Sequence, residues 1–117
     1  MKKFKIEHYD FGEMIVNGRE YRHDLIITPD RIIDNWWRIE GHRLQLADLQ
    51  DLEGVDFEYL VIGTGYSGLM RVDPEVIDSF EKRGIKVLVY STREAVRKYN
   101  ELVEKGKKVV GAFHLTC

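Results

Sequence analysis

Cysteine is almost absent from this chain of 117 residues, whose one thiol is Cys117. A single cysteine excludes an intramolecular disulfide, and the four scattered histidines do not add the paired ligand spacings of a structural zinc site. The fold must therefore depend on its apolar core, for which a hydrophobic content of 44% is sufficient at the size of one domain. We expect one domain over residues 1–117 that holds no metal and no cofactor.

The sequence also lacks any run of about 20 apolar residues, which is the length that a membrane-spanning helix needs. Its N-terminus is positively charged, but charged residues interrupt it before an apolar stretch of signal-peptide length appears. The net charge is -2 with both signs interspersed, whereas proteins that bind nucleic acid or anionic membranes cluster lysine and arginine. We therefore predict a soluble cytoplasmic protein that binds neither nucleic acid nor membrane.

Short strands and turns are the pattern of the first third of the sequence. The side chains of Phe4, Ile6 and His8 alternate with charged ones, which is typical of a half-buried strand. Asn17-Gly18 lies between two further strand-like runs, and this dipeptide is a strong signal for a two-residue hairpin turn. The sequence therefore predicts an N-terminal β-hairpin.

Strands and helices alternate in the rest of the chain, after an irregular stretch at residues 35–41. The remaining predicted strands are one before this stretch, at residues 25–28, and three after it, at residues 57–62, 86–90 and 109–113. A short helix over residues 46–52 is indicated by leucines at helical spacing, and two more helices begin at Asp73-Pro74 and at Ser91, which are typical N-cap signals. The predicted fold class is α/β, with a βαβαβ core and the N-terminal β-hairpin.

A glycine-rich turn follows directly on the buried strand that ends near Ile62. Gly63, Gly65 and Gly68 spell GxGxxG, the pattern with which dinucleotide-binding proteins approach a phosphate. That fingerprint also needs a helix at the third glycine and an acidic residue at the tip of the next strand, and this sequence has neither. Two interpretations stay open: a tight turn that needs positive φ, and a small-ligand pocket beyond the carboxyl end of the strand.

Charged and aromatic residues near this turn are candidates for binding a ligand. Arg71 follows the turn, and with Arg38 it can clamp a small carboxylate or phosphate, although surface ion pairs are the alternative role for both arginines. His42 can act as an acid or base, or can serve as a turn residue beside Gly41. The candidate ligand-binding residues are Gly63, Thr64, Gly65, Arg71, Arg38, Trp37 and His42.

Adjacent Trp36 and Trp37 point to opposite sides if their backbone is extended, so one ring can be buried while the other faces a cavity, a partner or a sheet edge.

His114 and Cys117 invite comparison with a thiol nucleophile and its base. The carboxylate on the same terminal residue disfavours a thiolate at Cys117, and a chain end rarely has fixed geometry. No other catalytic set is present in the sequence, and we predict no catalytic residue and no enzymatic activity.

Five segments taken together make the sequence distinctive: residues 34–38 (DNWWR), 41–42 (GH), 60–65 (LVIGTG), 99–100 (YN) and 114–117 (HLTC). On these segments, from about Ile6 to Cys117, the chain resembles the Mth-domain family. Its animal relatives include the adipogenesis-associated Mth domain-containing protein and a mitochondrial complex I assembly factor. The resemblance implies a three-layer α/β fold around a mixed sheet, but it does not by itself imply any particular activity.

Members of this family that act as assembly factors are imported into mitochondria, and the sequence shows no arginine-rich transit segment. We therefore expect a compact relative that acts as a protein-interaction or assembly module with an unknown protein partner. An exposed hairpin edge or tryptophan would also suit a homodimer. The alternative function is a small-anion or small-metabolite binding protein, or an enzyme, with its pocket at the turn from Gly63 to Gly68.

Overall fold

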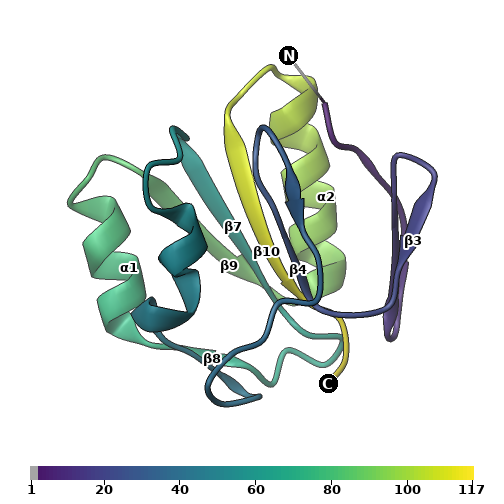
Figure 1. The fold of residues 1–117 in the computed structure, drawn as a ribbon, viewed down its shortest axis with the longest axis horizontal. Helices are drawn as coiled ribbons and strands as arrows, with labels where there is room; N and C mark the ends of the chain where they lie inside the picture. Colours follow the sequence, from purple (N-terminus) through teal and green to yellow (C-terminus); the bar gives the residue numbers. More distant parts are fainter. Residues whose placement is uncertain (1–2) are drawn as a thin grey trace.

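The computed structural model describes residues 3–117. At its centre is a five-stranded sheet with the strand order β5–β4–β10–β7–β9 (Figure 1). The strands are β4 (Leu25–Ile27), β5 (Ile32–Ile33), β7 (Tyr59–Thr64), β9 (Lys86–Tyr90) and β10 (Val109–His114). β10 and β9 both run parallel to β7, whereas β4 is antiparallel to β10 and to β5. The predicted mixed sheet is therefore confirmed.

The N-terminal strands form a separate antiparallel sheet, in the order β1 (Ile6–Asp10), β2 (Glu13–Val16) and β3 (Arg19–Tyr21). β2 and β3 are joined at Asn17 and Gly18, whose φ angles are 48° and 82°. Positive φ at both positions is what the favoured two-residue hairpin turn requires, and asparagine and glycine adopt it at the lowest cost. The predicted hairpin is confirmed.

Helices cover both faces of the central sheet, which gives three layers (Figure 1). α2 (Thr92–Glu104) packs on one face together with the N-terminal sheet, and the 3-10 helix η1 (Leu46–Leu52) and α1 (Pro74–Glu81) pack on the other. A two-stranded parallel pair, β6 (Arg43–Leu44) with β8 (Arg71–Val72), lies beside the sheet. In residues 3–117 no helix has the length and apolar character needed to cross a membrane.

Side-chain alternation along the central strands divides the core in two. On β7, Val61 faces α2 while Leu60 and Ile62 face η1 and α1. On β10, Phe113 likewise faces α2, while Ala112 faces η1 and α1. Strands buried on both faces need apolar residues at every position, which is why β7 and β10 read as continuous apolar runs in the sequence.

Two predicted helix caps differ in the structure. Asp73 occupies the N-cap position of α1, but its carboxylate accepts hydrogen bonds from the Arg43 guanidinium at 2.9 and 3.0 Å instead of capping the helix. Ser91 likewise occupies the N-cap position of α2 without a side-chain hydrogen bond to the helix. At Asp73 the tertiary contact with Arg43 replaces the local cap.

Candidate functional site

The glycine turn lies at the carboxyl end of β7, where a ligand of an open α/β sheet would bind. Its backbone amides are engaged within the protein. The Gly65 amide donates to Thr92 Oγ1 at 2.8 Å, and the Gly68 amide donates to the Gly65 carbonyl at 3.2 Å. The Tyr66 and Leu69 amides donate to the main-chain oxygens of Thr116 and Cys117, each at 3.3 Å. The C-terminal segment thus accepts hydrogen bonds from two of these four amides, those of Tyr66 and Leu69, and none of the four is free for a phosphate.

Close packing explains two of the glycines. A Cβ on Gly63 would lie 2.8 Å from Thr92 Oγ1, and a Cβ on Gly65, whose φ is 111°, would lie 2.5 Å from the Thr116 carbonyl oxygen. The neighbouring Thr64 is also engaged, because its hydroxyl donates to the Tyr90 carbonyl at 3.0 Å. A role in ligand binding stays a prediction for these three residues, and packing of the turn against α2 and the C-terminal segment accounts for glycine at positions 63 and 65.

Three charged or ionisable side chains meet beside this turn, and we refer to Asp24, Arg38 and His114 as the buried cluster. Asp24 precedes β4, Arg38 lies in the irregular stretch before β6, and His114 ends β10. Arg38 Nη1 lies 2.8 Å from Asp24 Oδ2, and His114 Nδ1 lies 2.8 Å from the same oxygen. The side chains of Arg38 and His114 are only 4% and 6% exposed.

The proton on the His114 ring can be placed from these contacts. Nδ1 lies 2.8 Å from Asp24 Oδ2 and 3.1 Å from Arg38 Nη2. An ionised carboxylate only accepts hydrogen bonds, so a bare Nδ1 lone pair would be repelled by the nearer neighbour, whereas an Nδ1–H donates to it. Arg38 Nη2 has the Gly41 carbonyl as a further acceptor at 2.8 Å. We therefore assign the proton to Nδ1, which leaves Nε2 as the free ring nitrogen.

Asp24 is held in its ionised form. Burial alone would raise the pKa of its carboxyl, but the hydrogen bonds from His114 and from the Leu115 amide, together with the charge of Arg38, lower that pKa below its ordinary value. The Leu115 amide donates to Asp24 Oδ1 at 2.7 Å. Asp24 therefore provides the counter-charge for Arg38 and fixes the orientation of the His114 ring.

Several polar atoms of the buried cluster lack partners. Within residues 3–117, Arg38 Nε, Arg38 Nη1 and His114 Nε2 are buried without a hydrogen bond, the 2.8 Å ion pair of Nη1 being poorly aligned for one. The three side chains of the cluster line a cavity of about 290 Å³. Its other lining residues are Arg22, His23, Asn35, Trp36, Trp37, Gly41 and Thr116. Buried donors without partners beside a cavity are an arrangement suited to an anion or an ordered water.

The remaining predicted site residues are distributed around this cavity. Trp36 is buried and its Nε1–H donates to the Asp48 carbonyl at 2.9 Å, while Trp37 lines the cavity and is 78% exposed. The His42 ring centroid lies 6.0 Å from that of His114. Arg71 is exposed on β8 and is not among the residues that line the cavity, so the structure does not bring the predicted pair of arginines together there.

Asp24 is the member of the site that the sequence did not reveal. It is one of 20 acidic residues, and its one distinguishing feature is its position directly before an apolar strand. The sequence draws attention to His114 only together with Cys117, whereas the contacts of its ring are with Asp24 and Arg38. These partners are 90 and 76 positions away in the chain, so only the folded sheet brings them together.

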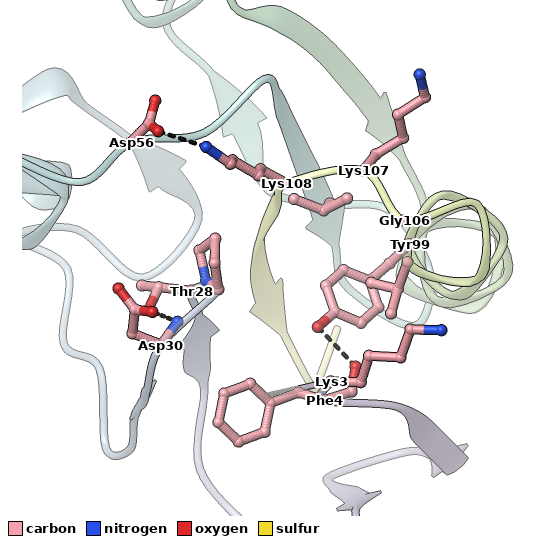
Figure 2. A pocket seen from close by; sticks show the side chains of 12 residues that line it. Lys3, Phe4, Thr28, Asp30, Asp56, Tyr99, Gly106, Lys107 and Lys108 are labelled. Atoms are coloured by element: carbon pink, nitrogen blue, oxygen red, sulfur yellow. Dashed lines mark hydrogen bonds and ion pairs between the residues drawn. The ribbon is translucent and has the colours of Figure 1, made fainter. Parts of the chain in front are cut away.

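A second cavity, of about 210 Å³, opens at the amino end of β10 (Figure 2). Lys3, Lys107 and Lys108 lie around it, but the Lys108 ammonium is paired with Asp56 at 2.6 Å. The Tyr99 hydroxyl in its wall donates to the Phe4 carbonyl at 2.8 Å. Its Lys108 and Tyr99 groups thus already have partners in the protein, and no buried polar side-chain atom without a partner is found among its described lining residues.

This architecture defines a class of three-layer α/β protein that is built on a mixed five-stranded sheet and has charged groups buried at one end of that sheet. The chain belongs to the family described as "Protein of unknown function (DUF498/DUF598)", whose model matches residues 6–114. This membership, together with a curated complex I assembly factor among the relatives, confirms the resemblance to the Mth-domain family.

The chain is similar to NADH dehydrogenase (ubiquinone) 1 alpha subcomplex assembly factor 3 of Xenopus tropicalis, at 26% identity over 111 residues, which are 92% of this chain and 59% of that protein. It is also similar to the 13 kDa major membrane protein of Francisella tularensis subsp. holarctica (strain LVS), at 27% identity over 88% of this chain and 84% of that protein. The chain therefore spans less than two thirds of the assembly factor's length.

A solved structure supports the same fold. The crystal structure of a conserved hypothetical protein from Pyrococcus horikoshii OT3 matches with a TM-score of 0.81 and 31% sequence identity, over 97% of this chain and 99% of that one. The expected three-layer α/β architecture is thereby confirmed.

Proposed function

We propose that this chain is a protein-interaction or assembly module that presents Trp37 to a protein partner. The observation that carries the proposal is the exposure of two large apolar side chains on one short loop: Trp37 is 78% exposed and Ile39 is 71% exposed. Large aromatic residues are over-represented among those that dominate binding energy at protein interfaces. The similarity to an assembly factor supports the same class of function.

The loop that carries these side chains is anchored at several positions. The Trp36 amide donates to the Asp24 carbonyl at 2.8 Å, the buried Arg38 side chain is paired with Asp24, and the Ile39 amide donates to Asp48 Oδ1 at 2.9 Å. Trp37 thus projects from a backbone that is already fixed. A preorganised anchor loses less conformational entropy on binding than one on a mobile loop, which favours an interface role.

The cellular setting is part of the proposal. We propose a cytoplasmic protein that binds neither nucleic acid nor membrane, on the basis of its interspersed charges and net charge of -2. The Francisella relative is named a membrane protein, so co-sedimentation with anionic vesicles is the direct check. Sedimentation of the purified chain with the vesicles would contradict this part of the proposal.

Comparative affinity purification tests the interaction function. The tagged chain is expressed in its source organism as wild type, as a Trp37→Ser/Ile39→Ser variant, and as a Leu69→Ser control, in which an apolar side chain that is 56% exposed is removed elsewhere. We expect a defined protein to co-purify with the wild type and the control and to fall by about tenfold or more with the double variant, as loss of an interface hot spot predicts.

Equal recovery from all three forms of the chain would contradict the proposal. Light scattering during size-exclusion chromatography of the same proteins tests the homodimer: a dimer that dissociates only in the double variant would make a second copy of this chain the partner at Trp37.

A second candidate function, binding of a small anion, is favoured by a different observation. Arg38 and His114 are both more than nine-tenths buried, and both have polar nitrogens without a hydrogen-bond partner in residues 3–117. This favours the buried cluster over the amides of the glycine turn as the anion's position. Chemical-shift changes at the Arg38 Nε–H on titration with simple anions test it, and their absence would contradict it.

A further inference from the structure

We propose that the cavity beside the buried cluster binds a small monocarboxylate, with the carboxylate at Arg38 and His114 and its apolar body against the tryptophan wall. The inference rests on the second candidate function, which it narrows to one chemical class. It does not rest on the protein-interaction module, although Trp37 belongs to both proposals. It depends on the charge balance of the cluster, its unpartnered donors and the composition of the cavity wall.

The charge balance of the cluster favours a monoanion. Arg38 is permanently positive, and its charge is offset by the ionised carboxylate 2.8 Å away on Asp24. Protonation of His114 at Nε2 then leaves one net positive charge in the cluster. A carboxylate carries one negative charge near neutral pH, which matches this single positive charge. A phosphate monoester carries about 1.5 to 2 negative charges and would leave buried negative charge without a counter-ion.

The unpartnered nitrogens are hydrogen-bond donors for such a ligand. Arg38 Nε–H has no acceptor among the described residues, and His114 Nε2 becomes a donor when it is protonated. Buried polar groups without partners are rare in folded proteins, because the lost hydration is not replaced. The two oxygens of a carboxylate supply one acceptor to each side chain, and charge-assisted hydrogen bonds of this kind are the stronger ones.

The cavity wall suits the rest of the ligand. At about 290 Å³ the cavity lies at the small end of the range for ligand pockets, which suits a compact monocarboxylate. Trp36 and Trp37 give it an aromatic wall. The donor atoms are covered in the structure, and the Arg38 guanidinium lies over the Trp36 ring, 4.9 Å from its centroid. A side chain must therefore move to admit the ligand, and Trp37, at 78% exposed, is the most exposed tryptophan of the wall.

Binding through His114 makes the affinity depend on pH. The charged or titratable groups that face its ring are Asp24, Arg38 and His42, and Arg22 and His23 lie at the rim of the cavity. Because the carboxylate is matched by the charged ring, carboxylate binding and proton binding at His114 are linked, and each favours the other.

Benzoate and benzamide form the probe pair that tests this inference. They have nearly the same shape, and only benzoate is an anion. Titration of the full chain by calorimetry and tryptophan fluorescence at pH 6 and pH 8, with inorganic phosphate as a third probe, requires no variant that perturbs the fold. We expect benzoate to bind at least about tenfold more tightly than benzamide, because only benzoate carries the negative charge that the cluster can offset.

Two arginine variants locate the site. Arg38→Gln should abolish benzoate binding, with circular dichroism as the check on its fold, whereas the exposed Arg71→Ala should leave the affinity unchanged. Trp37→Ala supplies a second test on a residue that contributes little to the fold, and it should remove the fluorescence response and weaken benzoate binding several-fold. Retained benzoate affinity in Trp37→Ala would overturn the assigned wall.

The outcomes separate the inference from the function on which it rests. Equal binding of benzamide and benzoate, or loss of benzoate binding in Arg71→Ala alone, would overturn the monocarboxylate site at the cluster. Phosphate binding that depends on Arg38, without benzoate binding, would overturn the inference and leave anion binding standing. No response to any of the three probes at either pH would overturn the inference and the second candidate function together.

Discussion

Gly65 offers the sharpest test of why the glycine turn is glycine-rich. Its φ of 111° belongs to a region that residues with a Cβ rarely adopt. A Cβ there would also lie 2.5 Å from the Thr116 carbonyl oxygen, 2.7 Å from the Cys117 carbonyl carbon and 2.9 Å from His114 Cδ2. Two of these neighbours are backbone atoms, so the clash cannot be relieved by rotating a side chain.

The expected cost of Gly65→Ala combines two effects. A strained backbone conformation costs about 1–3 kcal/mol, and overpacking against a fixed neighbour costs about 1–3 kcal/mol more. We therefore expect a loss of about 4 kcal/mol in the free energy of unfolding, the sum of the two central values. With a urea dependence of about 2 kcal/mol per molar, the unfolding midpoint should fall by about 2 M.

Two other glycines separate strain from clash. Gly54 has a φ of 80° and no atom within 4 Å of the position that a Cβ would occupy, so Gly54→Ala should show the strain alone, about 1 kcal/mol. Gly41 has neither a positive φ nor a close neighbour, and Gly41→Ala should change stability by about 0.5 kcal/mol or less. Urea unfolding monitored by far-ultraviolet circular dichroism measures all three. A loss for Gly65→Ala no larger than that for Gly54→Ala would refute the packing explanation of the turn.

Three further predictions concern the site and its surroundings. Trp36→Ala should cost about 3–5 kcal/mol of stability because the Trp36 ring is only 5% exposed. Trp37 is 78% exposed, so Trp37→Ala should change stability by about 0.5 kcal/mol or less. Equal costs of the two variants in thermal unfolding would contradict the placement of the two rings. The pKa of Asp24 is lowered in the folded state, so its contribution to stability is present above the unfolded value near 3.8 and is lost as pH falls through the folded value. Asp24→Asn should therefore be less stable than the wild type at pH 7 by about 3 kcal/mol, and its free energy of unfolding should fall less than that of the wild type between pH 5 and pH 2. The same fall in both proteins, measured by urea titrations, would refute this. Thr92 Oγ1 accepts a hydrogen bond from the Gly65 amide at 2.8 Å and donates one to the His114 carbonyl at 2.6 Å. Thr92→Val loses both bonds and should cost about 2–4 kcal/mol of stability, whereas Thr92→Ser keeps the hydroxyl and should cost about 1 kcal/mol. The reverse order of the two costs would contradict these hydrogen bonds.

Local signals in the sequence were sufficient for much of the fold. The hairpin at Asn17-Gly18 follows from the backbone preferences of two residues, and β7 and β10 follow from apolar runs long enough for a strand buried on both faces. The order of strands and helices after residue 57 then restricts the topology, because parallel strands joined by helices have few arrangements. These elements depend little on distant residues.

Contacts between distant residues account for what the sequence did not reveal. β6 and β8 are two residues each and exist because they pair with one another. Asp73 has the sequence signature of a cap, yet its carboxylate binds Arg43, 30 positions earlier. In each case a tertiary partner that no local pattern announces decides the structure, and the buried cluster is assembled in the same way.

Asp24 connects the two proposals made for this chain. Its carboxylate holds His114 and Arg38 at the cavity floor, and its carbonyl accepts the Trp36 amide at 2.8 Å, which fixes the loop that presents Trp37. Trp37 is therefore both a wall of the cavity and the proposed anchor for a partner. A ligand that displaces Trp37 must change the affinity for the partner, and by thermodynamic linkage the partner must change the affinity for the ligand by the same factor. Measuring benzoate affinity with and without the partner identified through Trp37 would reveal that factor, and a ratio of one would show that the two binding events are not coupled through Trp37.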